Sequence, residues 1–190
     1  MTYPNGNDSR EYYHEEDANE AKDPSSLVLS YLICPQDAAN AFLGALMITD
    51  CRARPQHFSF VSPIRPTRIQ RILYGATLDE HVKIDVVAKK LLADVPVAPD
   101  VLFVDEPELV IARKITDFPT AFLTKNPGAE IEPGRLTTLK YDTGPNTEDQ
   151  EAVGRILATL EDFVDLTEPF TRMREALKEV GKSFDESEGE

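Results

Sequence analysis

Three segments of strand length, close together near the start of the chain, limit the possible fold most strongly. Leu27 to Cys34 is rich in β-branched and aromatic residues, and Phe42 to Thr49 is an almost continuous apolar run. In Gln56 to Ser62, Phe58 and Phe60 fall on the same face, which is the period-two pattern of a half-exposed strand. We therefore predict three strands, the last two of which pair as a hairpin.

A short helix is predicted directly after the third strand. Thr67 to Tyr74 has helical spacing, and Gly75 is a residue type that often ends a helix. Within this helix Ile69, Ile72 and Leu73 are expected to face the core, because residues spaced three or four positions apart lie on the same side of a helix.

The rest of the chain alternates between strand and helix patterns. Thr77 and Glu80 have the spacing of a capping box and precede apolar residues at helical spacing, which predicts a longer second helix. Apolar residues at alternate positions within residues 81–85 leave open a strand that begins there instead. Further strands are predicted at residues 100–105, 120–124 and 136–141, and further helices at residues 107–114, 147–164 and 167–181. This order predicts a single mixed β-sheet covered by helices, of the α/β or α+β class, with two C-terminal amphipathic helices.

Acidic residues are concentrated at the two ends of the chain. Of the formal net charge of −14, residues 1–26 contribute −5 and residues 181–190 contribute −3. Both segments are poor in aliphatic residues, so we predict disordered acidic tails at 1–26 and 181–190 and one globular α/β domain at 27–180. The N-terminal tail carries Tyr3, Tyr12 and Tyr13, and it could fold onto a basic partner or across basic residues of its own domain.

Several classes of protein are disfavoured by missing patterns. No apolar run approaches the ~18 residues of a membrane span, and the N-terminus lacks the basic and apolar regions of a signal peptide. Cys34 and Cys51 lack CxxC spacing, and the three histidines lack HExxH spacing. The sequence also has no GxSxG, GxxxxGK[ST] or GxGxxG motif. We expect a cytoplasmic protein with no membrane contact, no cofactor and no zinc.

An arginine-rich stretch is the strongest indication of a contact surface. Between Cys51 and Leu78 the chain has no Asp or Glu but has five arginines, namely Arg52, Arg54, Arg65, Arg68 and Arg71. Guanidinium groups suit phosphate or carboxylate oxygens, and Tyr74 could add stacking. The leading prediction is a non-catalytic binding or adaptor module whose arginine-rich face contacts an acidic protein or nucleic acid. The alternative for these arginines is pairing with carboxylates of the same chain.

Two carboxylates suggest a second function. Asp50 and Asp105 each end a predicted strand, and carboxylates at neighbouring strand ends can hold Mg²⁺ for phosphodiester hydrolysis. The order of three strands, a helix and a fourth strand resembles that of ribonuclease-H-like proteins, although the first strand lacks the internal aspartate such a site needs. A metal-dependent, nuclease-like enzyme is therefore the alternative function. The sequence leaves the substrate and the oligomeric state open.

Overall fold

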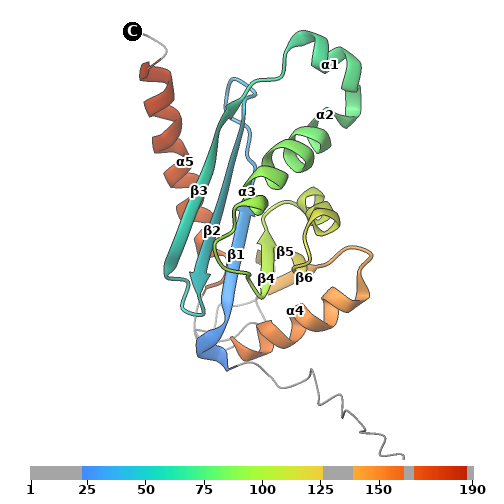
Figure 1. Cartoon of the computed structure of the whole chain (residues 1–190), viewed down its shortest axis with the longest axis vertical. Helices are drawn as coiled ribbons and strands as arrows, with labels where there is room; N and C mark the ends of the chain where they lie inside the picture. Colours follow the sequence, from blue (N-terminus) through green and yellow to red (C-terminus); the bar gives the residue numbers. More distant parts are fainter. Residues whose placement is uncertain (1–22, 126–138, 161–164, 188–190) are drawn as a thin grey trace, which may run out of the picture.

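The computed structural model describes residues 23–125, 139–160 and 165–187, with side chains to Gly181 in the last range. These residues form one mixed six-stranded sheet in the order β3-β2-β1-β4-β5-β6 (Figure 1). The strands are β1 (Val28–Ile33), β2 (Phe42–Asp50), β3 (Pro55–Ile64), β4 (Val101–Val104), β5 (Thr120–Lys125) and β6 (Leu139–Asp142). The predicted fold class, a single mixed sheet covered by helices, is confirmed.

The strand directions follow from the connections. β1, β2 and β3 form an antiparallel meander, whereas β4 returns next to β1 and runs parallel to it. β5 is parallel to β4, and β6 is antiparallel to β5. Ser30 stabilises the central parallel pair, because its buried hydroxyl donates a hydrogen bond to the carbonyl of Val101 at 2.7 Å. The predicted order of three strands, a helix and a fourth strand is confirmed.

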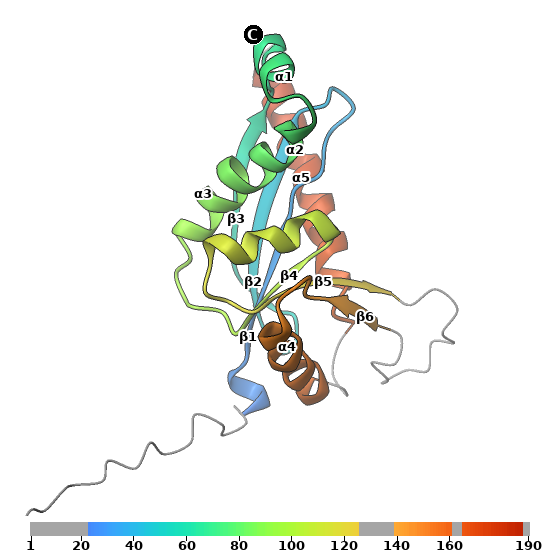
Figure 2. The ribbon, with the colours of Figure 1, turned by 90° about the vertical axis from the view of Figure 1, so that its right-hand side faces the viewer.

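Helices cover both faces of the sheet (Figure 2). A continuous helix spans α2 (Leu78–Glu80), a π-helical stretch (His81–Ala88) and α3 (Lys89–Ala93), and it packs on one face with the 3-10 helix Pro107–Ile115. α4 (Thr147–Thr159) and α5 (Glu168–Ser187) pack on the other face. On that face Tyr31 contacts Phe103 and Phe170, with ring centroids 5.6 and 5.3 Å apart.

Helix ends differ in detail from the sequence predictions. The capping box at Thr77 does not form, because its hydroxyl donates to the carbonyl of Tyr74 at 2.9 Å, and no strand begins at 81–85. α4 begins at Thr147, and Asn146 caps it, because the Asn146 side-chain oxygen accepts hydrogen bonds from the backbone N–H groups of Glu148 and Asp149. α5 continues past Gly181 to Ser187.

Some predictions lie outside the described residues. They include most of the N-terminal tail, the start of the strand predicted at 136–141, and the end of the helix predicted at 147–164. Within the described part of the chain, no helix is both long and apolar enough to cross a membrane.

Candidate binding surface

α1 (Arg68–Tyr74) lies at the upper end of the molecule, beyond the packed body of the sheet, and none of its residues is buried (Figure 1). The helix itself was predicted correctly, but its expected orientation is wrong. Ile69, Ile72 and Leu73 are 68, 70 and 77% exposed instead of facing the core. The physical reason is that the long helix that follows already covers this face of the sheet with its own apolar residues, so no core position remains for α1.

Local interactions hold α1 in a helical conformation. Thr67 and Gln70 form a capping box, in which the Thr67 hydroxyl accepts from the backbone N–H of Gln70 at 3.2 Å and the Gln70 side chain accepts from that of Thr67 at 2.8 Å. Gly75 ends the helix with a φ of 52°, a left-handed conformation that favours glycine. The rings of Tyr74 and His81 stack with their centroids 4.3 Å apart, which connects α1 to the following helix.

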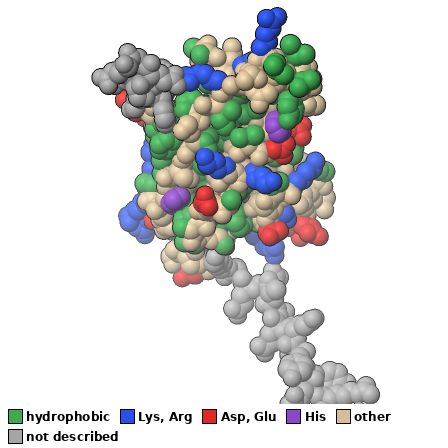
Figure 3. Space-filling model, turned by 45° about the horizontal axis from the view of Figure 1, so that its top comes forward, with side chains coloured by type: hydrophobic (Ala, Val, Ile, Leu, Met, Phe, Trp, Pro, Cys, Tyr) green, Lys and Arg blue, Asp and Glu red, His purple; other side chains and the backbone are tan. Residues whose placement is uncertain are grey.

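Basic side chains lie beside the exposed aliphatic groups. Arg68 and Arg71 are exposed, and neither has an ion pair with another described residue. We call the five side chains Arg68, Ile69, Arg71, Ile72 and Leu73 the α1 surface. Figure 3, with the top of the molecule brought forward, shows hydrophobic and basic side chains next to each other at this end.

The five arginines predicted to form one binding face do not lie together on one protein molecule. Arg52 and Arg54 lie in the β2–β3 hairpin connection, where the Asp50 carboxylate accepts from both of their backbone N–H groups at 2.9 Å. Arg65, Arg68 and Arg71 follow the opposite end of β3. A strand of ten residues spans about 30 Å, so the structure separates the stretch into two basic groups.

The two carboxylates of the nuclease-like alternative are not brought together either. Asp50 pairs with Val28 at the amino end of β1, whereas Asp105 follows β4 at the carboxyl end of the parallel β1–β4 pair. The two residues lie at opposite ends of the ladder because β2 is antiparallel to β1. Among the described residues, no group of three or more His, Cys, Asp or Glu side chains could hold a metal ion.

Asp105 instead belongs to a charged pair that the sequence analysis missed. Its side chain is only 5% exposed and forms an ion pair with Arg174 of α5, while its second oxygen, Oδ1, has no hydrogen-bond partner among the described groups. Burial raises the pKa of the Asp105 carboxyl to about 6, and the Arg174 guanidinium opposes this shift. No spacing rule could have paired residues 69 positions apart.

Asp105 makes stability depend on pH. An unfolded aspartate has a pKa near 3.9, so between roughly pH 4 and pH 6 the folded state holds a proton that the unfolded state has released. The free energy of unfolding should therefore fall as pH rises through this window, by up to about 3 kcal/mol. In urea unfolding, the free energy of unfolding of Asp105→Asn minus that of wild type should therefore increase by up to about 3 kcal/mol from pH 4 to pH 7. A difference that stays constant with pH would contradict this assignment.

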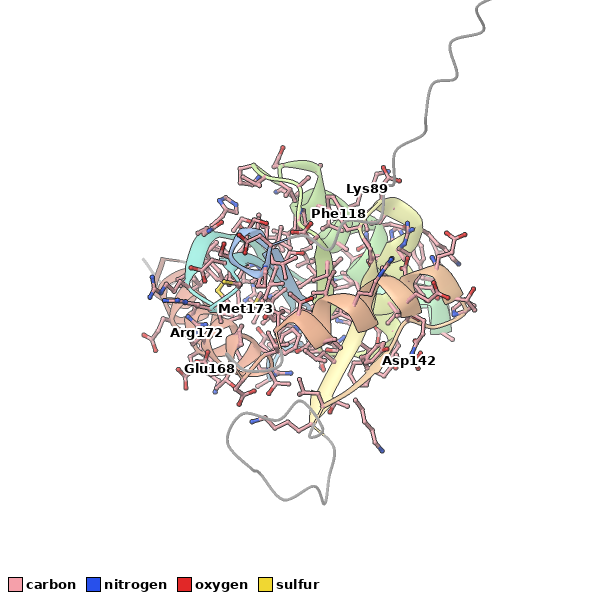
Figure 4. The ribbon with its side chains drawn as sticks, turned by 90° about the horizontal axis from the view of Figure 1, so that it is seen from below. Lys89, Phe118, Asp142, Glu168, Arg172 and Met173 are labelled. Atoms are coloured by element: carbon pink, nitrogen blue, oxygen red, sulfur yellow. The ribbon has the colours of Figure 1, made fainter. Side chains whose placement is uncertain are left out.

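A cleft of about 960 Å³ lies between α5 and the ends of β2 and β3. Its lining combines apolar groups such as Leu43 and Leu177 with the basic residues Arg65, Arg172 and Arg174. These cations have partners elsewhere. Arg172 donates to the carbonyl of Ala53 at 2.7 Å and pairs with Glu168 at 2.9 Å, and Figure 4 shows Arg172 and Glu168 side by side on α5. The cleft therefore offers fewer free charges than its composition suggests.

Comparisons with known proteins give weak likenesses of fold only. The chain matches no family model and no curated protein. A Ciona intestinalis endonuclease V, crystallised with inosine-containing DNA, is 9% identical over 58% of this chain and 50% of its own chain, with a TM-score of 0.34. A Marinitoga piezophila Argonaute in complex with guide RNA is 13% identical over 60% of this chain and 18% of its own, with a TM-score of 0.31. At such low scores neither likeness carries an argument about function.

Proposed function

We propose that this protein is a non-catalytic binding module that docks its α1 surface onto an acidic protein. The observation that carries this proposal is the exposure of Ile69, Ile72 and Leu73 on a capped helix that has no buried residue. A seven-residue helix is marginal in water by itself, and exposed clusters of large aliphatic groups commonly mark contact sites. Each aliphatic side chain that becomes fully buried in a partner contributes about 1.5–3 kcal/mol to binding.

The composition of the α1 surface supports an acidic protein over nucleic acid. Arg68 and Arg71 beside the aliphatic groups suit a hydrophobic groove with carboxylates on its rim. Single-stranded nucleic acid is bound by basic side chains together with aromatic stacking, whereas the most exposed apolar groups of the α1 surface are aliphatic. The only aromatic ring of α1, Tyr74, is already stacked on His81. Helix-in-groove docking therefore fits the α1 surface better.

Site-specific cross-linking in the cells that make the protein tests the proposal. A photoreactive benzoylphenylalanine at Leu73 should capture a protein with an acidic surface, and the same group at Glu151, an exposed residue of α4, should not. The captured protein is then purified and titrated with wild type. An adduct with nucleic acid, or with residues 1–22 of the same chain, would contradict the proposal.

Variants of the purified protein test the residues individually. Ile72→Ser should weaken binding to the captured protein at least tenfold, because losing about 1.4 kcal/mol of apolar burial changes Kd by that factor. Arg68→Glu with Arg71→Glu should also weaken binding, more strongly at low salt. The matched control is Lys89→Glu with Lys90→Glu, two exposed lysines at the start of α3. Equal loss from the two charge reversals would reject α1 as the docking element.

A further inference from the structure

The two edge strands of the sheet differ in the features that protect an edge. β6 has four residues, of which Lys140 and Asp142 are charged and exposed. β3 has ten residues and no charged side chain. Short length and charged side chains are usual ways in which a sheet edge avoids pairing with another chain. By this comparison within one molecule, β3 is the less protected edge over residues 57–61, which lie between the prolines and register shifts near its two ends.

Two exposed aromatic side chains lie on β3. Phe58 and Phe60 are 36 and 43% exposed, and their ring centroids are 6.2 Å apart. They lie opposite Met47 and Ala45 of β2, whose side chains belong to the core on the α5 side, so both phenylalanines are on that face of the sheet. No strand of the described chain pairs with the outer edge of β3, because β3 is the last strand in the order.

We propose that β3 pairs in antiparallel fashion with β3 of a second copy of this chain, about a two-fold axis at Ser59. The regular part of the β2–β3 ladder runs from His57 to Val61, with register shifts beyond both ends, and Ser59 is its centre. About this axis Phe58 of each copy lies opposite Phe60 of the other. Aromatic cross-strand pairs of this kind stabilise antiparallel strands.

The properties of β3 favour a second copy over a strand from another protein. The strand is self-complementary about Ser59, since the same pair of phenylalanines is used on both sides and Pro55 lies opposite Pro63 just outside the regular ladder. Because β3 has no charged side chain, two copies of the strand can pair without repulsion between like charges at the paired positions. An isologous two-fold contact is the commonest form of homo-oligomer.

The same register places like charges near each other. Arg54 of one copy lies opposite Ile64 of the second copy, next to that copy's Arg65. Repulsion between these arginines, and between the two acidic chains as a whole, is screened by salt. Association through β3 should therefore become stronger as salt is added, whereas docking of the α1 surface through ion pairs should become weaker.

Disulfide cross-linking tests the register in the full-length protein. In a Cys51→Ser background, Ser59→Cys should form a covalent dimer under mild oxidation, because the two Ser59 positions face each other at about 5 Å between Cβ atoms. Ser62→Cys is the matched control. Ser62 is more exposed than Ser59, but the proposed register separates the two copies of Ser62 by about 20 Å. Equal or faster linking through Ser62→Cys would overturn the proposed pairing.

Sedimentation of uncross-linked protein gives an independent readout. Wild type should show a concentration-dependent dimer that strengthens with salt, and Phe58→Lys with Phe60→Lys should be monomeric. Ile72→Ser should still form the dimer, which separates this inference from the function proposed for α1. A wild-type protein that is monomeric at roughly 1 mM would overturn the inference and leave the α1 proposal intact. A dimer abolished by Ile72→Ser but not by the phenylalanine replacements would also overturn it.

Discussion

Replacement of Asp149 by alanine should lower the free energy of unfolding by about 3–5 kcal/mol, the usual cost of removing one partner of a buried ion pair. The Asp149 side chain is 3% exposed and lies 2.8 Å from Nε of Arg113. It also accepts from the backbone N–H of Thr120 at 3.0 Å. Alanine would leave this N–H group and the half-buried Arg113 guanidinium without the partner that connects the 3-10 helix, β5 and α4.

Urea unfolding measures this loss. Glu151→Ala in the same helix is the control, because its side chain is exposed and surface substitutions usually change stability by no more than about 0.5 kcal/mol. Asp149→Asn should be intermediate, since an amide oxygen can still accept from Thr120 but carries no charge for Arg113. If Asp149→Ala and Glu151→Ala had the same effect, the Arg113–Asp149 pair would not be a structural connection.

Gly44→Ala should lower the free energy of unfolding by about 1–3 kcal/mol, since extra atoms in a packed core force neighbours out of position. A Cβ at Gly44 would lie 2.2 Å from Cγ1 of Val87 and 3.0 Å from Cγ2 of Val61. Both valines are buried, so neither can rotate into solvent. The absence of a side chain at Gly44 therefore allows the long helix to approach β2 closely.

A double-mutant cycle checks the cause. Val87→Ala combined with Gly44→Ala should be less destabilised than the sum of the two single changes, because truncating Val87 removes the clash. The control is Gly181→Ala in α5, where a Cβ would have no neighbour within 4 Å and alanine favours the helix. Strict additivity of Gly44→Ala and Val87→Ala would contradict the close approach.

The sheet could be predicted because its strands carry local signals. The apolar runs that form β1 and β2, and the alternation of Phe58 and Phe60 in β3, appear in the sequence without knowledge of any partner. The pairing of β1 with β4 was not predictable by the same means, because it joins residues about 70 positions apart. Hydrophobic periodicity identifies an element, but it does not say which neighbour covers it.

The orientation of α1 shows this limit most clearly. Ile69, Ile72 and Leu73 have the spacing of a core-facing stripe, yet they are exposed because other residues fill the core. The arginines show a related limit. Arg54 and Arg65 are close in sequence but are separated by the whole of an extended strand, which converts a short stretch of sequence into a long distance. Arg174, which reaches Asp105 from α5, had no signal at all.

The position of β4 between β1 and β5 also affects how the protein is made. The β1–β3 meander is complete once Ile64 has been synthesised, but the strand that covers the other side of β1 begins only at Val101. At about 5–20 residues per second, translation takes roughly 2–7 s to cover this interval. During that time β1, which is buried from Leu29 to Ile33 in the finished protein, is an open edge on the nascent chain. Until β4 has been made, the nascent chain therefore exposes a hydrophobic strand edge that the finished protein covers on both sides.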